Sequence, residues 1–79
     1  MQPTKIKELI EAQLPGAQVS VEGDDGVHFA ATVIYTGFEG KSRVEQQQMV
    51  YAALATHITS GNIHALSLKT YTPGENQTR

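Results

Sequence analysis

The sequence contains no cysteine, and its aromatic residues make up only 6% of 79 residues. Without cysteine the chain forms no disulfide, no thiolate metal site and no cysteine nucleophile. The sequence also lacks an apolar run of about 20 residues, which a membrane-spanning helix needs. Its first residues, Met1 to Lys5, lack the apolar stretch of a signal peptide. These absences predict a cytoplasmic protein without membrane contact.

Positive charge is scarce as well. Six Lys and Arg residues oppose eight Asp and Glu residues, and the formal net charge is −2. A nucleic-acid-binding protein normally has a basic surplus or a basic stripe, so the composition does not support binding of duplex DNA. A chain of this length forms one domain that buries only about 60–65% of its unfolded surface. It has no room for a walled active-site cavity, so we predict that the protein is not an enzyme.

The first half of the chain has the pattern of a helix followed by a hairpin. Residues 4–14 repeat apolar side chains at helical spacing, with Thr4 as the expected N-cap. Residues 17–22 and 27–36 alternate apolar and polar side chains, as half-buried strands do. The turn Gly23-Asp24-Asp25-Gly26 separates them, so we expect the two strands to pair antiparallel.

The second half predicts a long helix, a last strand and a tail. Ser42 is a suitable cap for a helix over residues 43–60, and Gly61 stands where a helix C-terminal glycine belongs. Residues 63–71 are rich in aliphatic and β-branched side chains and form the expected final strand. The order α-β-β-α-β predicts an α/β fold whose three-stranded mixed sheet is covered by helices on one face. We expect one domain over residues 1–73 and a disordered polar tail over residues 74–79.

Three histidines are candidate functional residues. His64 begins the final strand on the same face as Leu66 and Leu68, where an imidazole could reach a metal ion such as iron; the alternative is a half-buried histidine bonded to a carbonyl. His28 follows the hairpin turn and points away from the core side of its strand. It is either a second metal ligand or a solvated residue at a strand end. His57 lies on the inner stripe of the long helix and is interpreted as a packing residue.

Other polar motifs have simpler interpretations. Asp24 and Asp25 are expected to stabilise the hairpin turn through local backbone hydrogen bonds. The segment Gly37-Phe38-Glu39-Gly40 spells the G-x-x-G signature of a nucleic-acid-binding loop, but we interpret it as a turn with Phe38 against the core. Gln46-Gln47-Gln48 is expected to place amides on the helix surface.

Three stretches in this order resemble the BolA family. They are Phe38-x-Gly40-Lys41-Ser42 leading to Val50, the tripeptide Ile63-His64-Ala65, and Lys69-Thr70-x-Thr72-Pro73. The resemblance runs from Lys5 to Pro73. Ser42-Arg43-Val44, Gln47-Gln48-x-Val50-Tyr51 and Ile63-His64-Ala65-Leu66-Ser67 are most similar to the IbaG (YrbA) branch of that family. Each motif is moderately specific alone, and their joint order carries the resemblance.

The resemblance implies a fold related to class II KH domains and a protein that binds a monothiol glutaredoxin. The pair would share a bridging [2Fe–2S] cluster in iron–sulfur cluster trafficking or in iron and stress sensing. The cysteine of the glutaredoxin and glutathione would hold one iron. The BolA-like chain would contribute His64 and a ligand from the loop between its first two strands, either His28 or, as a harder oxygen ligand, Asp25. The isolated protein would carry no cofactor and would be a monomer or a weak dimer.

The alternative function is a KH-like, nucleic-acid-binding transcriptional regulator. Its contact surface, or a surface for a protein partner, would include Lys41, Arg43 and Lys69. Two departures from the family weaken this alternative. Gln46-Gln47-Gln48 stands where other members carry Arg-His-Arg, and Gly74-Glu75-Asn76 replaces the start of a Trp-containing helical tail.

Overall fold

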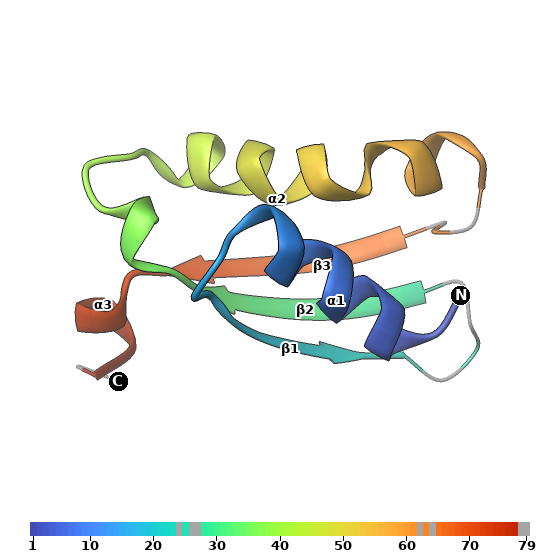
Figure 1. The fold of residues 1–79 in the computed structure, drawn as a ribbon, viewed down its shortest axis with the longest axis horizontal. Coiled ribbons are helices and arrows are strands. Elements are labelled where there is room, and N and C mark those ends of the chain that lie inside the picture. The colour runs from blue at the N-terminus through green and yellow to red at the C-terminus, as the bar shows by residue number, and fades with distance from the viewer. Residues whose placement is uncertain (24, 26–27, 62, 64, 78–79) are drawn as a thin grey trace.

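The computed structural model describes residues 1–23, 25, 28–61, 63 and 65–77. Its helices and strands follow the predicted order, with two short helices added (Figure 1). The elements are α1 (Pro3–Gln13), β1 (Gln18–Glu22), β2 (His28–Ile34), the 3-10 helix η1 (Thr36–Phe38), α2 (Arg43–Thr59), β3 (Ala65–Tyr71) and α3 (Pro73–Gln77). No helix in the described part of the chain is both long enough and apolar enough to cross a membrane.

The three strands form one mixed sheet with the order β1-β2-β3. β1 and β2 pair antiparallel, with Val19 opposite Val33. β2 and β3 pair parallel, with Val33 opposite Thr70. The parallel pair requires a crossover, which α2 provides. The predicted three-stranded mixed sheet is therefore confirmed.

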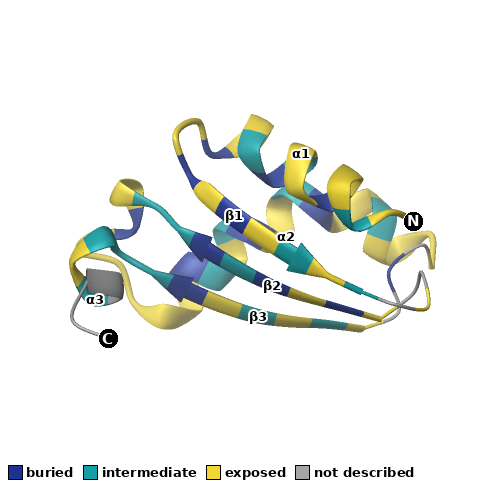
Figure 2. Ribbon diagram, turned by 90° about the horizontal axis from the view of Figure 1, so that it is seen from below, coloured by how far each residue is buried: buried dark blue, intermediate teal, exposed yellow. Residues whose placement is uncertain are grey.

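Both long helices pack against the same face of the sheet. Figure 2 shows the sheet from below, with α2 behind the strands and α1 beside β1. None of the described helices covers the opposite face, and Ser20, Ala30 and Ser67 are exposed there. The alternation of buried and exposed residues along β2 matches this one-sided cover.

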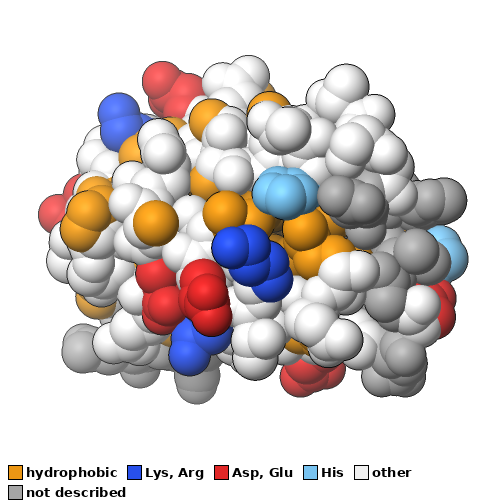
Figure 3. Space-filling view, turned by 45° about the vertical axis from the view of Figure 1, so that its right-hand side comes forward, with side chains coloured by type: hydrophobic (Ala, Val, Ile, Leu, Met, Phe, Trp, Pro, Cys, Tyr) orange, Lys and Arg blue, Asp and Glu red, His pale blue; other side chains and the backbone are white. Residues whose placement is uncertain are grey.

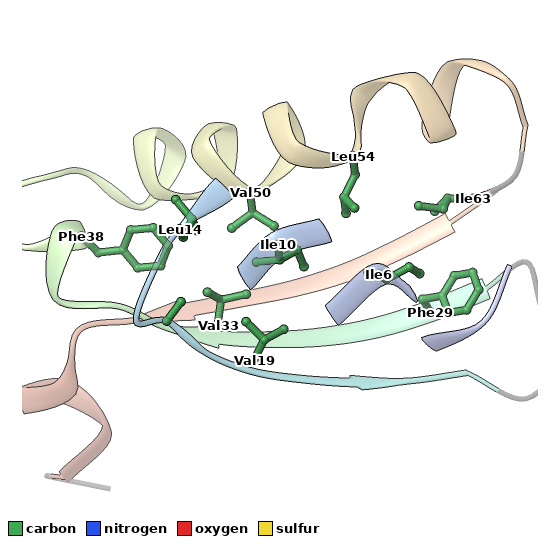
Figure 4. Close-up of a cluster of buried hydrophobic side chains, with 11 residues drawn as sticks. Ile6, Ile10, Leu14, Val19, Phe29, Val33, Phe38, Val50, Leu54 and Ile63 are labelled. Atoms are coloured by element: carbon green, nitrogen blue, oxygen red, sulfur yellow. The ribbon is translucent and has the colours of Figure 1, made fainter. Parts of the chain in front are cut away.

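The core lies between the helices and the sheet (Figure 4). Phe38, Ile6, Ile10, Leu54, Val33 and Val50 are its largest fully buried apolar side chains. They come from α1, β2, η1 and α2, so these elements bury their apolar faces together. The prediction that Phe38 packs into the core is confirmed, and the G-x-x-G segment is a turn around that buried ring.

Local sequence signals explain both ends of α2. The Ser42 hydroxyl accepts a hydrogen bond from the Glu45 N–H, while the Glu45 carboxylate accepts one from the Ser42 N–H. This reciprocal capping box satisfies two donors that the helix cannot satisfy itself. Gly61 follows the helix with φ of 84°, a left-handed conformation that favours glycine. The predicted cap and the predicted glycine are both confirmed.

Two local predictions were wrong. Thr4 is not the N-cap of α1, because the helix begins at Pro3, whose missing N–H costs nothing at a first helical position. The final strand was predicted to begin at residue 63, whereas β3 begins at Ala65. The structure buries Ile63 at 3% exposure, because β3 begins only at Ala65 and strand alternation does not apply before it.

The predicted disorder beyond Pro73 is also wrong for residues 74–77, which belong to α3. The Thr72 N–H donates to the Glu75 carboxylate at 2.9 Å, and the Glu75 N–H donates to the Thr72 hydroxyl at 3.3 Å. Thr72, Pro73 and Glu75 thus form a capping box with proline at the first helical position. The sequence contained this signal directly after the final strand, which ends at Tyr71.

Candidate functional site

The starts of β2 and β3 lie at the same end of the molecule, together with the end of α2 (Figure 1). His28 is the first residue of β2, and its register partner is Ala65, the first residue of β3. His64, the other predicted ligand, lies outside the described residues. Its chain neighbours Ile63 and Ala65 are described, and Ala65 is the register partner of His28.

His28 is held by Asp25 through two separate contacts. The His28 main-chain N–H donates to Asp25 Oδ1 at 2.8 Å. The His28 ring nitrogen Nδ1 lies 2.5 Å from Asp25 Oδ2. The two side chains are 61% and 51% exposed, so the pair faces outward from the strand end. The predictions that His28 is not a core residue and that Asp25 supports the turn are both confirmed.

This arrangement has a clear chemical consequence. A carboxylate on one ring nitrogen of histidine directs metal binding to the other nitrogen, which is the usual environment of metal-ligating histidines. His28 therefore fits the role of an imidazole ligand through Nε2. Asp25, the alternative ligand, has both carboxylate oxygens directed at His28. Asp25 is better suited to support His28 than to replace it.

The surroundings of the pair are open. A depression of about 320 Å³ lies beside it and is lined by Glu22, Gly23, Asp25, His28, Phe29 and Ala30. An apolar hollow of about 100 Å³ lies near the start of β3, lined by Tyr51, Ile58, Ile63, Ala65 and Leu66. Tyr51 and Ile58 are each 37% exposed, which is high for large apolar side chains. Apolar side chains and a supported imidazole are thus accessible near the same end of the sheet.

Two of the three predicted basic residues line one groove. Arg43 and Lys69 line a groove of about 270 Å³ between α2 and β3. Lys41 is exposed in the loop before α2 and does not line that groove. The face shown in Figure 3 carries acidic and basic side chains interspersed, with no basic stripe.

Arg43 has internal contacts. Its guanidinium donates to the main-chain carbonyl of Thr70 and, at 3.1 Å, to the side chain of Gln46. A second guanidinium nitrogen lies 2.8 Å from the Glu75 carboxylate. The same guanidinium lies over the Tyr71 ring, 5.7 Å from its centroid. Arg43 thereby joins α2, the end of β3 and α3.

The carboxylates near these helix starts have lowered pKa values. The main-chain N–H of Thr72, and then the Arg43 guanidinium, lower the pKa of Glu75 below its ordinary value of 4.5. The main-chain N–H and the hydroxyl of Ser42 lower the pKa of Glu45 in the same way. Both groups are stabilised as carboxylates by N–H groups at a helix start.

Gln46 is a structural residue that the sequence interpretation missed. It was expected on the helix surface, yet it is only 4% exposed. Its amide donates to the carbonyls of Phe38 and Lys41 and accepts from the Thr70 hydroxyl at 2.8 Å. Gln46 precedes the buried Val50 by four residues, so helical spacing extends the core face to it. That spacing was the signal that could have identified it.

The fold and the site define a class of protein. It is a small α/β domain with one covered sheet face and an exposed, carboxylate-supported histidine where two parallel strands begin. The BolA-like protein family matches residues 8–75. The chain belongs to the BolA family.

Individual relatives agree with this assignment. The chain is 40% identical over 75 residues to the acid stress protein IbaG of Escherichia coli K12, covering 95% of this chain and 88% of that protein. A bolA protein homologue from Coxiella burnetii has a similar structure, with a TM-score of 0.85 and 46% identity, covering 98% of this chain and 97% of that one. The BolA domain of SufE1 from Arabidopsis thaliana has a TM-score of 0.80 and 32% identity, with 92% and 93% coverage.

Proposed function

We propose that this protein is a non-enzymatic adaptor that binds a monothiol glutaredoxin and shares a bridging [2Fe–2S] cluster with it. The adaptor would act in iron–sulfur cluster trafficking or in iron and stress sensing. The observation that carries the proposal is the exposed Asp25–His28 pair. His28 is the register partner of Ala65, which directly follows His64 in the sequence. Membership of the BolA family and the stress-related name of the relative IbaG support the same role.

The roles of the chain's own residues follow from this proposal. His28 and His64 would each offer an imidazole nitrogen, and nitrogen donors suit cluster iron, as mixed histidine and cysteine ligation in Rieske centres illustrates. The partner and glutathione would supply the sulfur ligands, since this chain has no cysteine. When bound, the cluster would supply electron transfer and transferable iron and sulfur. The chain itself would bind and orient.

A titration followed by visible absorption and circular dichroism tests the proposal. The protein is added to a glutaredoxin homodimer that already holds a [2Fe–2S] cluster with glutathione. We expect a new spectrum that saturates at one protein per glutaredoxin. An unchanged spectrum, together with no complex on size-exclusion chromatography, would contradict the proposal.

Three variants then assign the ligands. His28→Ala and His64→Ala should each prevent or alter the new spectrum, because each removes one nitrogen donor. His57→Gln is the matched control, since His57 lies on α2 and outside the proposed ligand set. If His64→Ala gives the wild-type spectrum, His64 is not a ligand.

A further inference from the structure

We propose that Asp25 is a positioning residue that holds the neutral His28 imidazole in one tautomer, protonated at Nδ1. Nε2 then carries the lone pair and is the ring atom presented to a metal. The link to a metal rests on the proposed function, whereas the state of the ring is a property of this chain alone. The geometry that carries the inference is the 2.5 Å approach of Asp25 Oδ2 to His28 Nδ1.

The chemistry of the two groups fixes the direction of this hydrogen bond. An ionised carboxylate only accepts hydrogen bonds, whereas a neutral imidazole has one donor and one acceptor nitrogen. Between an ionised Asp25 and a neutral His28, a contact of 2.5 Å places the proton on Nδ1. A metal ligand needs the opposite nitrogen to be deprotonated, and this tautomer provides it.

A simpler role for Asp25 is to stabilise the turn. Each carboxylate oxygen serves one of the two roles, stabilising the turn or orienting the imidazole. Oδ1 accepts from the His28 main-chain N–H at 2.8 Å, which is the turn contact. Oδ2 lies 2.5 Å from the ring nitrogen Nδ1, and this is the contact that orients the imidazole. The substitution Asp25→Asn tests the two roles separately. The amide oxygen keeps the turn contact, while the amide NH₂ faces Nδ1 and favours the tautomer with the proton on Nε2.

The role of Asp25 in the structure differs from both roles that the sequence suggested. Asp25 was considered either as a turn residue or as a weaker metal ligand. The spacing Asp25-x-x-His28 allows one carboxylate to reach both the main chain and the ring of the same histidine. The structure thus assigns Asp25 a third role, in which it acts on the metal site only through His28.

The first test uses the protein alone. Two-bond ¹H–¹⁵N correlation spectra, recorded at a pH where imidazole is neutral, report which ring nitrogen carries the proton. We expect His28 of the wild type to be protonated mainly at Nδ1 and Asp25→Asn to shift the proton mainly to Nε2. His57 gives an internal control in every spectrum and should not change. A wild-type His28 protonated at Nε2, or an unchanged tautomer in Asp25→Asn, would overturn the proposal.

The second test adds the glutaredoxin homodimer that holds the [2Fe–2S] cluster. Asp25→Asn should bind roughly 10- to 100-fold more weakly in the circular dichroism titration, which is the usual effect of losing such a carboxylate. The control is Glu22→Gln, which also removes one negative charge from the lining of the same depression. Glu22 makes neither of the two contacts that Asp25 makes with His28, so this variant should bind as the wild type does. Equal binding by Asp25→Asn and wild type would overturn the role of Asp25 toward the metal. Absence of the new spectrum with the wild type would instead contradict the proposed function, and the tautomer result would still stand.

Discussion

At the end of the sheet where β3 finishes, polar side chains bond to the protein's own main chain. At the end where β2 and β3 begin, the Asp25–His28 pair is more than half exposed. Gln46 is buried at the first end and spans two loop carbonyls and the Thr70 hydroxyl. The two ends therefore differ in burial: the Gln46 amide is enclosed, whereas the Asp25–His28 pair also bonds to the main chain but leaves its side chains exposed. Arg43, which the sequence suggested for binding, has contacts with Thr70, Gln46 and Glu75 at the end where β3 finishes.

The largest effect on stability is expected from Gln46→Ala. The substitution leaves the Thr70 hydroxyl and the carbonyls of Phe38 and Lys41 without their buried partner. A buried polar group that loses its partner costs about 1–3 kcal/mol, so we expect unfolding free energy to fall by about 3 kcal/mol in urea. Gln48→Ala, on the exposed side of α2, is the control and should change it by less than about 0.5 kcal/mol. Equal stability of the two variants would contradict the internal role of Gln46.

A pair of glycine substitutions compares the two ends directly. A Cβ at Gly23 would meet the Phe29 ring at 2.5 Å and the His28 carbonyl oxygen at 2.9 Å. We therefore expect Gly23→Ala to lower unfolding free energy by about 2 kcal/mol and to move the His28 signals in NMR spectra. At Gly74 a Cβ would meet nothing within 4 Å, and Gly74→Ala should leave stability unchanged within about 1 kcal/mol. Similar losses of unfolding free energy in Gly23→Ala and Gly74→Ala would contradict this difference between the two ends.

Arg43→Met should have a smaller effect, confined to the end where β3 finishes. It removes the hydrogen bond to the Thr70 carbonyl and the ion pair with Glu75. The side chains of Arg43 and Glu75 are 48% and 40% exposed. Because exposed ion pairs contribute little, we expect a loss of about 1 kcal/mol and weaker helical NMR shifts in α3. Cluster binding should be unchanged. A large loss of cluster binding in Arg43→Met would indicate that Arg43 belongs to the partner surface.

The smallest effect concerns acid pH. The pKa of Glu75 is lowered in the folded protein, so its contribution is present above its ordinary value of 4.5 and is lost as pH falls through the lower, folded value. The NMR signals of Thr72 and Glu75 should therefore titrate together below pH 4.5. In Arg43→Met the Glu75 midpoint should rise, because one of the groups that favour the carboxylate is gone. An unchanged midpoint would remove Arg43 as a cause.

Sequence patterns predicted the features that depend on local spacing. Ser42 with Glu45 marked the start of α2, Gly61 marked its end, and alternation along β2 identified its core face. Patterns that cross element boundaries were missed. Ile63 was expected inside the final strand, yet it is buried before β3 begins.

The candidate site was predicted only in part for a related reason. His28 stood out as an exposed histidine after a turn, but its contact with Asp25 depends on the bend of the loop rather than on the residue types. Gln46 is polar, so composition placed it on the surface, although helical spacing from Val50 placed it inside. Thr72 and Glu75 follow a strand, where a new helix was not expected. In each case the sequence did not show which residue the fold would bring into contact with the side chain.

The central claim is that a partner meets this protein at the end where β2 and β3 begin. The most direct measurement is an NMR spectrum of the ¹⁵N-labelled protein bound to a glutaredoxin that holds the [2Fe–2S] cluster, because a paramagnetic cluster broadens nearby amide signals. We predict broadening of Asp25, His28 and Ala65, with the signals of Arg43 and Glu75 kept sharp. Broadening centred on Arg43 and Glu75 would contradict the account.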